Sequence, residues 1–263
     1  MKKLKIYQID AFAEELFTGN PAAVCILEAW LEEELMQNIA MENNLAETAF
    51  VVKKENHYQI RWFTPELEVD LCGHATLASA YVLFNYYNHT TDVIKFHSER
   101  SGPLTVSKQT SGELTLDFPA DVLEEVSIRK EITDALGMSP RTMFKGKTDY
   151  VLIYNSEQEI KSMDPNFFLL DKVDARGIIV TAPGMEVDFV SRFFAPRCGI
   201  PEDPVTGSAH TSLTPYWAEQ LGKKDMIARQ LSQRGGALSC SLRGDRVLIK
   251  GKAVPYLTGE ILL

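Results

Sequence analysis

The sequence predicts a mixed α/β (α+β) protein made of two pseudo-symmetric domains. Three short motifs occur twice in the same order: RWFTP at 61–65 and RFFAP at 192–196, GHATLAS at 73–79 and GSAHTSL at 207–213, RSGPLTV at 100–106 and RGGALSC at 234–240. The glycine of the second motif and the arginine of the third lie 27 residues apart in both halves. Self-similarity of this kind indicates duplication. We therefore expect one domain over residues 1–120 and another over residues 121–263.

Local patterns agree with this fold class. KIYQIDAF near the start and TAFVV at 48–52 are rich in β-branched and aromatic residues, which predicts strands. Residues 30–42 carry Leu31, Leu35 and Ile39 at a spacing of four, which predicts a helix with one apolar face. A glycine then opens an apolar, helix-like stretch in each half. Pro215 lies inside the second stretch and is expected to kink it.

Composition excludes several classes of function. The net charge is -9, whereas nucleic-acid binding needs a basic face. No apolar run is longer than six residues, so no membrane span and no secretory signal are expected. None of the four cysteines forms a C-x-x-C pair, which argues against a zinc or redox motif. We expect a cytoplasmic protein with reduced thiols.

The two glycine turns are candidate anion sites. A helix start presents unpaired N–H groups and a partial positive charge, and glycine lets a ligand approach the backbone. Gly73 and Gly207 would each hold a carboxylate or an enolate oxygen, in a cleft between the two domains. The alternative is a pair of ordinary helix caps, with Asp70 or Ser208 as the capping residue.

The segment RCGIPEDPVTGSAH at 197–210 concentrates polar residues. Glu202, Asp203 and His210 are possible metal ligands, but Pro204 interrupts them, and we expect no metal. Ser208 does not lie in a G-x-S-x-G elbow, and neither G-x-G-x-x-G nor a P-loop occurs. The remaining interpretation is a polar wall that holds an anion and handles protons.

At these residues the chain resembles the PhzF-like (phenazine-biosynthesis-like) isomerase family. The shared segments are DAFAEELFTGNPAAVCIL near the start, NNLAETAFV at 43–51, FTPELEVDLCGHATLASA at 63–80 and EDPVTGSAH at 202–210. The resemblance implies a diaminopimelate-epimerase-like fold, in which each domain is a curled sheet around a central helix. It also implies a homodimer, a small acidic metabolite as substrate, and no cofactor.

The resemblance assigns roles to individual residues. Glu47 corresponds to the acid/base of the family. The residues expected to line the substrate are His74, Asp203 and Ser208, the glycines of the two turns, and Asn20 from the matching TGNP segment.

The expected chemistry moves a proton on a carboxylate-bearing molecule. The ordinary pKa of a glutamate, ~4.3, is low for a base that acts on carbon, and burial near Leu45 and Phe50 would raise that of Glu47. One glutamate can then take a proton from one carbon and return it to another. Two alternatives stay open: an epimerase or dehydratase based on Cys72, which precedes Gly73, and a protein that binds a small acid without turning it over.

Overall fold

The computed structural model describes residues 3–263, which form two compact units. Unit 1 comprises the described residues up to Asp117 together with Lys250–Leu263, and unit 2 comprises Phe118–Ile249. The first boundary lies close to the predicted one at residue 120. The last strand differs from the prediction, because it belongs with unit 1 and not with the second half of the chain. Its backbone pairs with the first strand, from Lys3↔Leu262 to Ala11↔Ala253.

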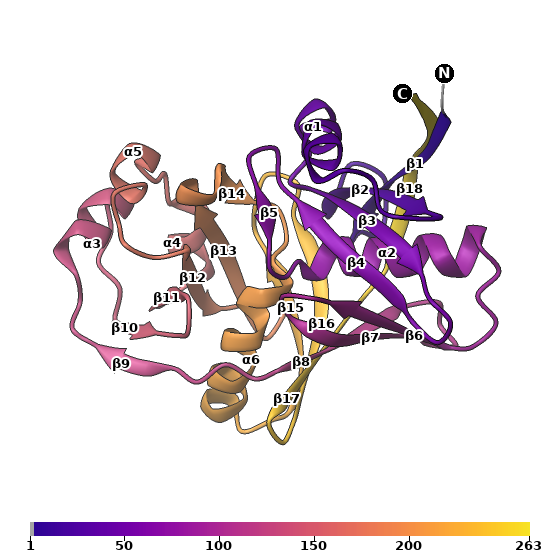
Figure 1. Ribbon diagram of the computed structural model, residues 1–263. Coiled ribbons are helices and arrows are strands. Elements are labelled where there is room, and N and C mark those ends of the chain that lie inside the picture. The colour runs from indigo at the N-terminus through magenta and orange to yellow at the C-terminus, as the bar shows by residue number, and fades with distance from the viewer. Residues whose placement is uncertain (1–2) are drawn as a thin grey trace. The chain divides into compact units, whose positions relative to one another are not determined.

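Unit 1 is a curled sheet with two helices (Figure 1). Its elements are β1 (Lys3–Ala11), β2 (Asn20–Leu27), α1 (Glu33–Asn43), β3 (Glu47–Lys53), β4 (Tyr58–Phe63), β5 (Glu68–Val69), α2 (Gly73–Tyr86), β6 (Val93–Ser98), β7 (Gly102–Lys108), β8 (Leu114–Pro119) and β18 (Ala253–Leu262). The strands pair in the order β18-β1-β2-β3-β4-β6-β7-β8. The β2–β3 and β4–β6 pairs are parallel and the others antiparallel.

Unit 2 repeats this plan with more helical insertions. Its elements are β9 (Glu124–Val126), α3 (Lys130–Leu136), β10 (Thr142–Lys145), β11 (Asp149–Ile153), α4 (Glu157–Ser162), α5 (Phe167–Leu170), β12 (Gly177–Pro183), β13 (Phe189–Ala195), the 3₁₀ turn Pro196–Cys198, β14 (Ile200–Asp203), α6 (Gly207–Leu221), β15 (Asp225–Gln230), β16 (Gly236–Arg243) and β17 (Arg246–Gly251). The strands pair as β9-β10-β11-β12-β13-β15-β16, with β11–β12 and β13–β15 parallel.

The matching orders confirm two pseudo-symmetric domains. In each unit a short antiparallel partner, β5 or β14, follows the strand that carries the repeated R-x-F motif. Gly73 and Gly207 then open the equivalent helices α2 and α6. The helix predicted over 30–42 is also present, although α1 begins later, at Glu33.

Each long helix lies inside its sheet, as predicted for a central helix. Helix α2 contacts β1, β2, β3, β7 and β18, and ten of its residues are buried. A helix buried on all sides needs apolar residues around its whole circumference, and the run from Ala75 to Leu83 supplies them. Helix α6 contacts β11, β15 and β16 in the same way. No helix within residues 3–263 is long and apolar enough to cross a bilayer.

Pro215 does not interrupt α6, which runs unbroken from Gly207 to Leu221. A proline at this position deprives the carbonyl of Thr211 of its helical donor. The N–H of Asp121 donates to that carbonyl at 3.2 Å, and the carboxylate of Asp121 accepts from Ser212 Oγ at 2.8 Å. A backbone donor from outside the helix therefore replaces the missing bond.

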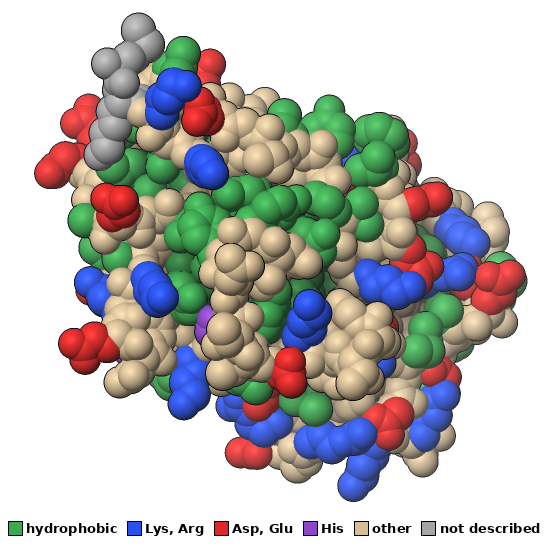
Figure 2. All heavy atoms as spheres, turned by 90° about the vertical axis from the view of Figure 1, so that its right-hand side faces the viewer, with side chains coloured by type: hydrophobic (Ala, Val, Ile, Leu, Met, Phe, Trp, Pro, Cys, Tyr) green, Lys and Arg blue, Asp and Glu red, His purple; other side chains and the backbone are tan. Residues whose placement is uncertain are grey.

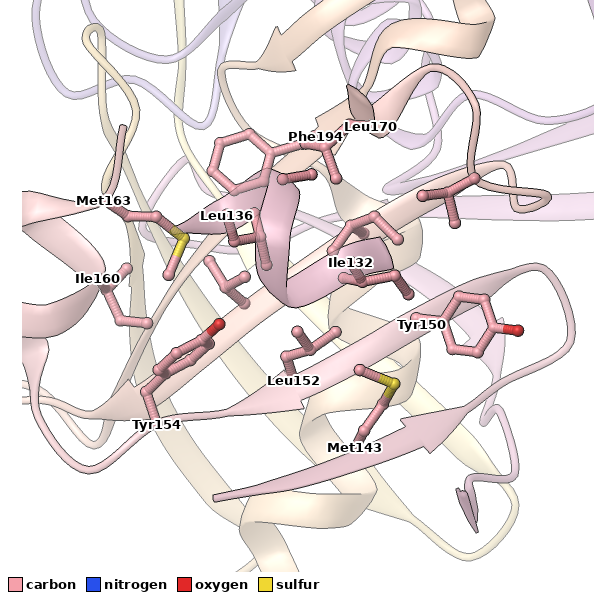
Figure 3. Close-up of a cluster of buried hydrophobic side chains, with 14 of the residues drawn as sticks. Ile132, Leu136, Met143, Tyr150, Leu152, Tyr154, Ile160, Met163, Leu170 and Phe194 are labelled. Atoms are coloured by element: carbon pink, nitrogen blue, oxygen red, sulfur yellow. The ribbon is translucent and has the colours of Figure 1, made fainter. Parts of the chain in front are cut away.

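A hydrophobic cluster joins the short helices of unit 2 to its sheet. Side chains from α3, α4 and α5 meet side chains from β10, β11, β12 and β13, as Figure 3 shows for Leu136, Leu152, Ile160 and Phe194. These four residues are at most 2% exposed. The short helices thus bury their apolar sides in this cluster. The start of α6 does not belong to the cluster and carries polar side chains.

Candidate active site

Glu47 is the first residue of β3 and is buried, with 8% of its surface exposed. Asn44, in the left-handed conformation with φ 50°, ends α1 and turns the chain toward this strand. Glu47 pairs with Ala22 of the parallel strand β2. A buried carboxylate is costly unless it has hydrogen-bond partners, so the groups around Glu47 decide what it does.

The imidazole of His74 lies against the carboxylate of Glu47. His74 is the second residue of α2 and is 3% exposed, and its Nε2 lies 3.2 Å from Glu47 Oε2. Burial lowers the pKa of His74 to about 3. The ring is therefore neutral at physiological pH. It faces Glu47 as a neutral group and not as a cation, and the contact between Nε2 and Oε2 does not have the geometry of a hydrogen bond.

Two further groups lie at the other ring nitrogen. Asn20 Nδ2 is 3.1 Å from His74 Nδ1, and Cys72 Sγ is 3.4 Å from the same atom. Asn20 is fully buried at the start of β2, directly after Gly19. Gly19 has φ 67°, and a Cβ there would come within 2.3 Å of the carbonyl oxygen of Ala11. Only glycine fits this turn, which directs Asn20 toward α2.

Glu47, Cys72 and His74 also form a group of potential metal ligands. One ligand atom from each lies within 4.8 Å of the others. The sequence-based interpretation did not find this group, because its members come from two segments of the chain. Cys72 contacts Nδ1 and Glu47 contacts Nε2. These two nitrogens point away from each other. A metal ion bound to one nitrogen would therefore not use the residue that contacts the other nitrogen.

In unit 2, Asp203 ends β14 and is held by its neighbours. It is 7% exposed, and its carboxylate accepts from Thr206 Oγ1 at 2.5 Å. Gln230 Nε2 donates to the carbonyl of Asp203 at 2.7 Å, and Gln230 Oε1 accepts from the N–H of Thr206 at 2.9 Å. Gln230 thus fixes the turn between β14 and α6, a role that the sequence did not reveal.

Ser208, the second residue of α6, contacts a cation that the sequence analysis missed. Arg176 Nη2 donates to Ser208 Oγ at 3.0 Å. The same guanidinium forms a two-point ion pair with the buried carboxylate of Asp149, one bond being Nε to Oδ1 at 2.9 Å. A guanidinium whose charge is paired with Asp149 therefore lies beside the start of α6. Within the described chain, neither Cys72 nor Thr206 caps its helix with a side-chain hydrogen bond.

Glu202 and His210, which the sequence analysis considered as metal ligands and set aside, each bind other groups. Glu202 forms a two-point ion pair with Arg192, at 2.7 and 2.9 Å. His210 Nδ1 donates to the carbonyl of Thr206 at 2.8 Å, and burial lowers the pKa of His210 to about 4. Thr76 at the equivalent position of α2 donates to the carbonyl of Cys72 at 2.6 Å. His210 thus supports the helix start.

Strand register shows which positions of the two units correspond. Thr48 pairs with Phe63, and Ile178 pairs with Phe194, the equivalent residue of the second R-x-F motif. Gly177 therefore takes the place of Glu47. A Cβ at Gly177 would lie 2.2 Å from the ring of Phe193. Unit 2 has no acid at this position.

The residues at the starts of the equivalent helices α2 and α6 also differ between the two units. Thr206 takes the place of Cys72, and Ser208 takes the place of His74. The Arg176–Ser208 contact of unit 2 is the counterpart of the Glu47–His74 contact of unit 1. At this place unit 1 thus has a carboxylate beside an imidazole, and unit 2 has a guanidinium beside a hydroxyl.

Comparisons with known proteins place the whole chain in one family. The model of the family described as phenazine biosynthesis-like protein, PhzC-PhzF, matches residues 9–259. Two proteins of Pseudomonas aeruginosa named as uncharacterized isomerases are 51% and 48% identical, and each alignment covers at least 99% of both chains. The crystal structure of a PhzF family protein from Enterococcus faecalis has a TM-score of 0.95 at 48% identity and covers 100% of both chains.

More distant structures share the fold alone. A predicted epimerase from Pseudomonas aeruginosa has a TM-score of 0.75 at 19% identity, over 99% of both chains. A hydroxyproline epimerase from Agrobacterium vitis has a TM-score of 0.68 at 8% identity, over 98% of this chain and 92% of that one. These likenesses confirm the predicted epimerase-like fold. The chain belongs to the phenazine biosynthesis-like (PhzC-PhzF) family and is an isomerase of that family.

Proposed function

We propose that the protein is a cofactor-independent isomerase that moves a proton on a small carboxylate-bearing metabolite, with Glu47 as the acid and base. The observation that carries this proposal is the contact of the buried Glu47 carboxylate with a neutral His74 at 3.2 Å. A neutral imidazole can donate a hydrogen bond to the carboxylate once the two groups are aligned. It does not compete with Glu47 as the proton carrier at neutral pH.

The proposed reaction needs no redox step. Glu47 takes a proton from a carbon of the substrate. The electron pair of that C–H bond moves toward the adjacent carboxylate group, which gives an enolate. Glu47, now protonated, returns the proton to a second carbon, and the electron pair forms the new C–H bond. Donors that hold the enolate charge are as necessary as the base itself. The helix starts at Gly73 and Gly207 are the proposed donors.

Substrate binding by Asp203, Ser208 and Asn20 stays a prediction from the family resemblance. The cation of Arg176 beside Ser208 supports an acidic ligand at the start of α6. Asp203 is held by Thr206 and Gln230, as a residue that meets a ligand in fixed geometry would be. For Asn20, the hydrogen bond to His74 favours a role inside the protein.

The alternative based on Cys72 predicts a different chemistry. Cys72 is 5% exposed and lies beside His74, so a thiol mechanism has a possible partner. A two-thiol racemase would need a second cysteine, but Thr206 takes the equivalent place in unit 2. A non-catalytic binder remains the other alternative. A heavy-water screen of small carboxylic acids separates it from an isomerase, because a binder incorporates no deuterium into carbon.

Ser208→Ala should weaken the binding of an acidic ligand. If one net hydrogen bond is lost, the cost is about 0.5–1.5 kcal/mol. Titration calorimetry with an acid found in the exchange screen measures the effect. Ser162→Ala is the matched control, because Ser162 is exposed and bonds only a neighbouring carbonyl, at 3.3 Å. Equal affinities of both variants would remove Ser208 from the binding site.

We also propose that the protein is a homodimer, as the resemblance implies. Figure 2 looks onto the side of unit 1 where α2 ends, and hydrophobic side chains form a broad band on this face. Tyr86 and Tyr87 at the end of α2 are 42% and 38% exposed. Light scattering at micromolar concentration should give twice the mass of the 29.5 kDa chain. A single-chain mass would contradict the proposal.

A further inference from the structure

We propose that Asn20 is a positioning residue that sets the tautomer of His74, so that the proton of the imidazole is on Nε2 and faces Glu47. The inference rests on the proposed function, in which Glu47 must be an oriented carboxylate. It concerns a residue that does not reach the reacting atoms. Asn20 acts through His74, and its whole side chain is buried.

The hydrogen bond from Asn20 to the imidazole selects this tautomer. A neutral imidazole has one N–H donor and one acceptor nitrogen. Asn20 Nδ2 donates to Nδ1 at 3.1 Å, so Nδ1 is the acceptor and the proton is on Nε2. Nε2 then faces Glu47 Oε2 at 3.2 Å, a contact that does not have hydrogen-bond geometry and does not by itself place the proton. The amide can serve here because its NH₂ group donates without taking part in proton exchange.

The opposite arrangement is chemically distinct. A reversed amide would present Asn20 Oδ1 to Nδ1, and Nδ1 would then carry the proton. Nε2 and Glu47 would face each other as two acceptors unless Glu47 were protonated. Glu47 would rest as an acid and would be unable to begin the reaction by taking a proton. The orientation of one buried amide thus decides the resting state of the proposed base.

The duplicated unit supports the assignment. Ala22 pairs with Glu47 in unit 1, and Asp149 pairs with Gly177 in unit 2, so Lys147 takes the place of Asn20. In unit 2 the residue in the place of His74 is Ser208, whose hydroxyl has no tautomer to fix. The amide is present where an imidazole needs it and is replaced where none exists.

Cys72 is the competing donor. Its Sγ is 3.4 Å from Nδ1, within reach of a weak S–H hydrogen bond. Burial and the turn at Gly19 hold the Asn20 amide in place, and an amide N–H is the stronger donor. We therefore expect Asn20 to set the tautomer of His74 without help from the thiol. A variant without the thiol tests this expectation.

The experiment is ¹⁵N NMR of the protein labelled at its histidines, which number five. The spectrum of His74→Gln assigns the His74 signals. In the wild type we expect a protonated Nε2 and an unprotonated Nδ1. Asn20→Asp offers Nδ1 an acceptor in place of a donor and should move a proton onto it. Cys72→Ala should leave the wild-type signature, and so should Asn85→Asp, which adds the same charge at an exposed position of α2.

The outcomes separate this inference from the proposed function. A protonated Nδ1 in the neutral ring of wild-type His74 overturns the inference without any variant, even if Asn20→Asp does not fold. A change of tautomer in Cys72→Ala but not in Asn20→Asp also overturns it. If Asn20→Asp changes the tautomer, the inference holds. Hydrogen exchange by that variant should then fall by about 10²–10⁴-fold, and unchanged exchange would count against Glu47 as the base.

Discussion

Glu47→Gln is expected to reduce proton transfer by about 10²–10⁴-fold, the contribution of a positioned acid/base group. The amide has the shape of the carboxylate but cannot take a proton from carbon. Binding of an acidic ligand should survive, because the proposed anion contacts are the starts of α2 and α6. Deuterium incorporation from heavy water, measured beside ligand affinity, distinguishes the two effects.

Two matched variants make this result specific. Glu42→Gln removes a carboxylate from an exposed position of α1 and should exchange like the wild type. Cys72→Ala removes the thiol beside His74 and should also have little effect. If Cys72→Ala abolished exchange while Glu47→Gln retained it, the thiol mechanism would replace the glutamate mechanism.

Acid is expected to destabilise the protein through two buried histidines. Burial lowers the pKa of His74 to about 3 and that of His210 to about 4, whereas a histidine in the unfolded chain titrates near 6.5. Below pH 6.5 the unfolded chain binds protons that the folded chain does not. Stability is therefore full above about pH 6.5 and is lost as the pH falls toward these values.

The size of the loss can be estimated for each histidine. The free energy of unfolding changes by at most about 1.4 kcal/mol per pH unit for one proton. Between pH 6.5 and 4 each histidine thus contributes as much as about 3 kcal/mol. Urea unfolding from pH 7 to 4.5 should show a smaller pH dependence for His74→Gln and for His210→Gln than for the wild type. The exposed His97→Gln is the control. Parallel curves for all four proteins would contradict this account.

Much of the fold could be predicted from the sequence, because duplication leaves a local signal. The repeated R-x-F and glycine motifs mark β4 and β13 and the starts of α2 and α6. The strand that returns to unit 1 could not be predicted, since its pairing with β1 joins the two ends of the chain. The effect of Pro215 was also beyond reach, because its compensation comes from Asp121 in a distant segment.

The candidate site was predictable in its members more than in its contacts. Glu47 and His74 were found through a family resemblance, but nothing in their local sequence shows that the two side chains meet. Arg176 gave no signal of its own. Its significance depends on strand register, which shows that the next residue, Gly177, is the counterpart of Glu47. Asn20 was expected to touch substrate, and its contact with His74 depends on the turn at Gly19.

The most direct test of the central claim follows one hydrogen atom through the reaction. An acid identified by the exchange screen is labelled with deuterium at the carbon that loses its proton, and the reaction is run in ordinary water. A buried Glu47 that takes and returns the same proton predicts that part of the label appears at the second carbon. Glu47→Gln should abolish this transfer. Transfer of the label by Glu47→Gln at the wild-type rate would contradict the claim that Glu47 carries the proton.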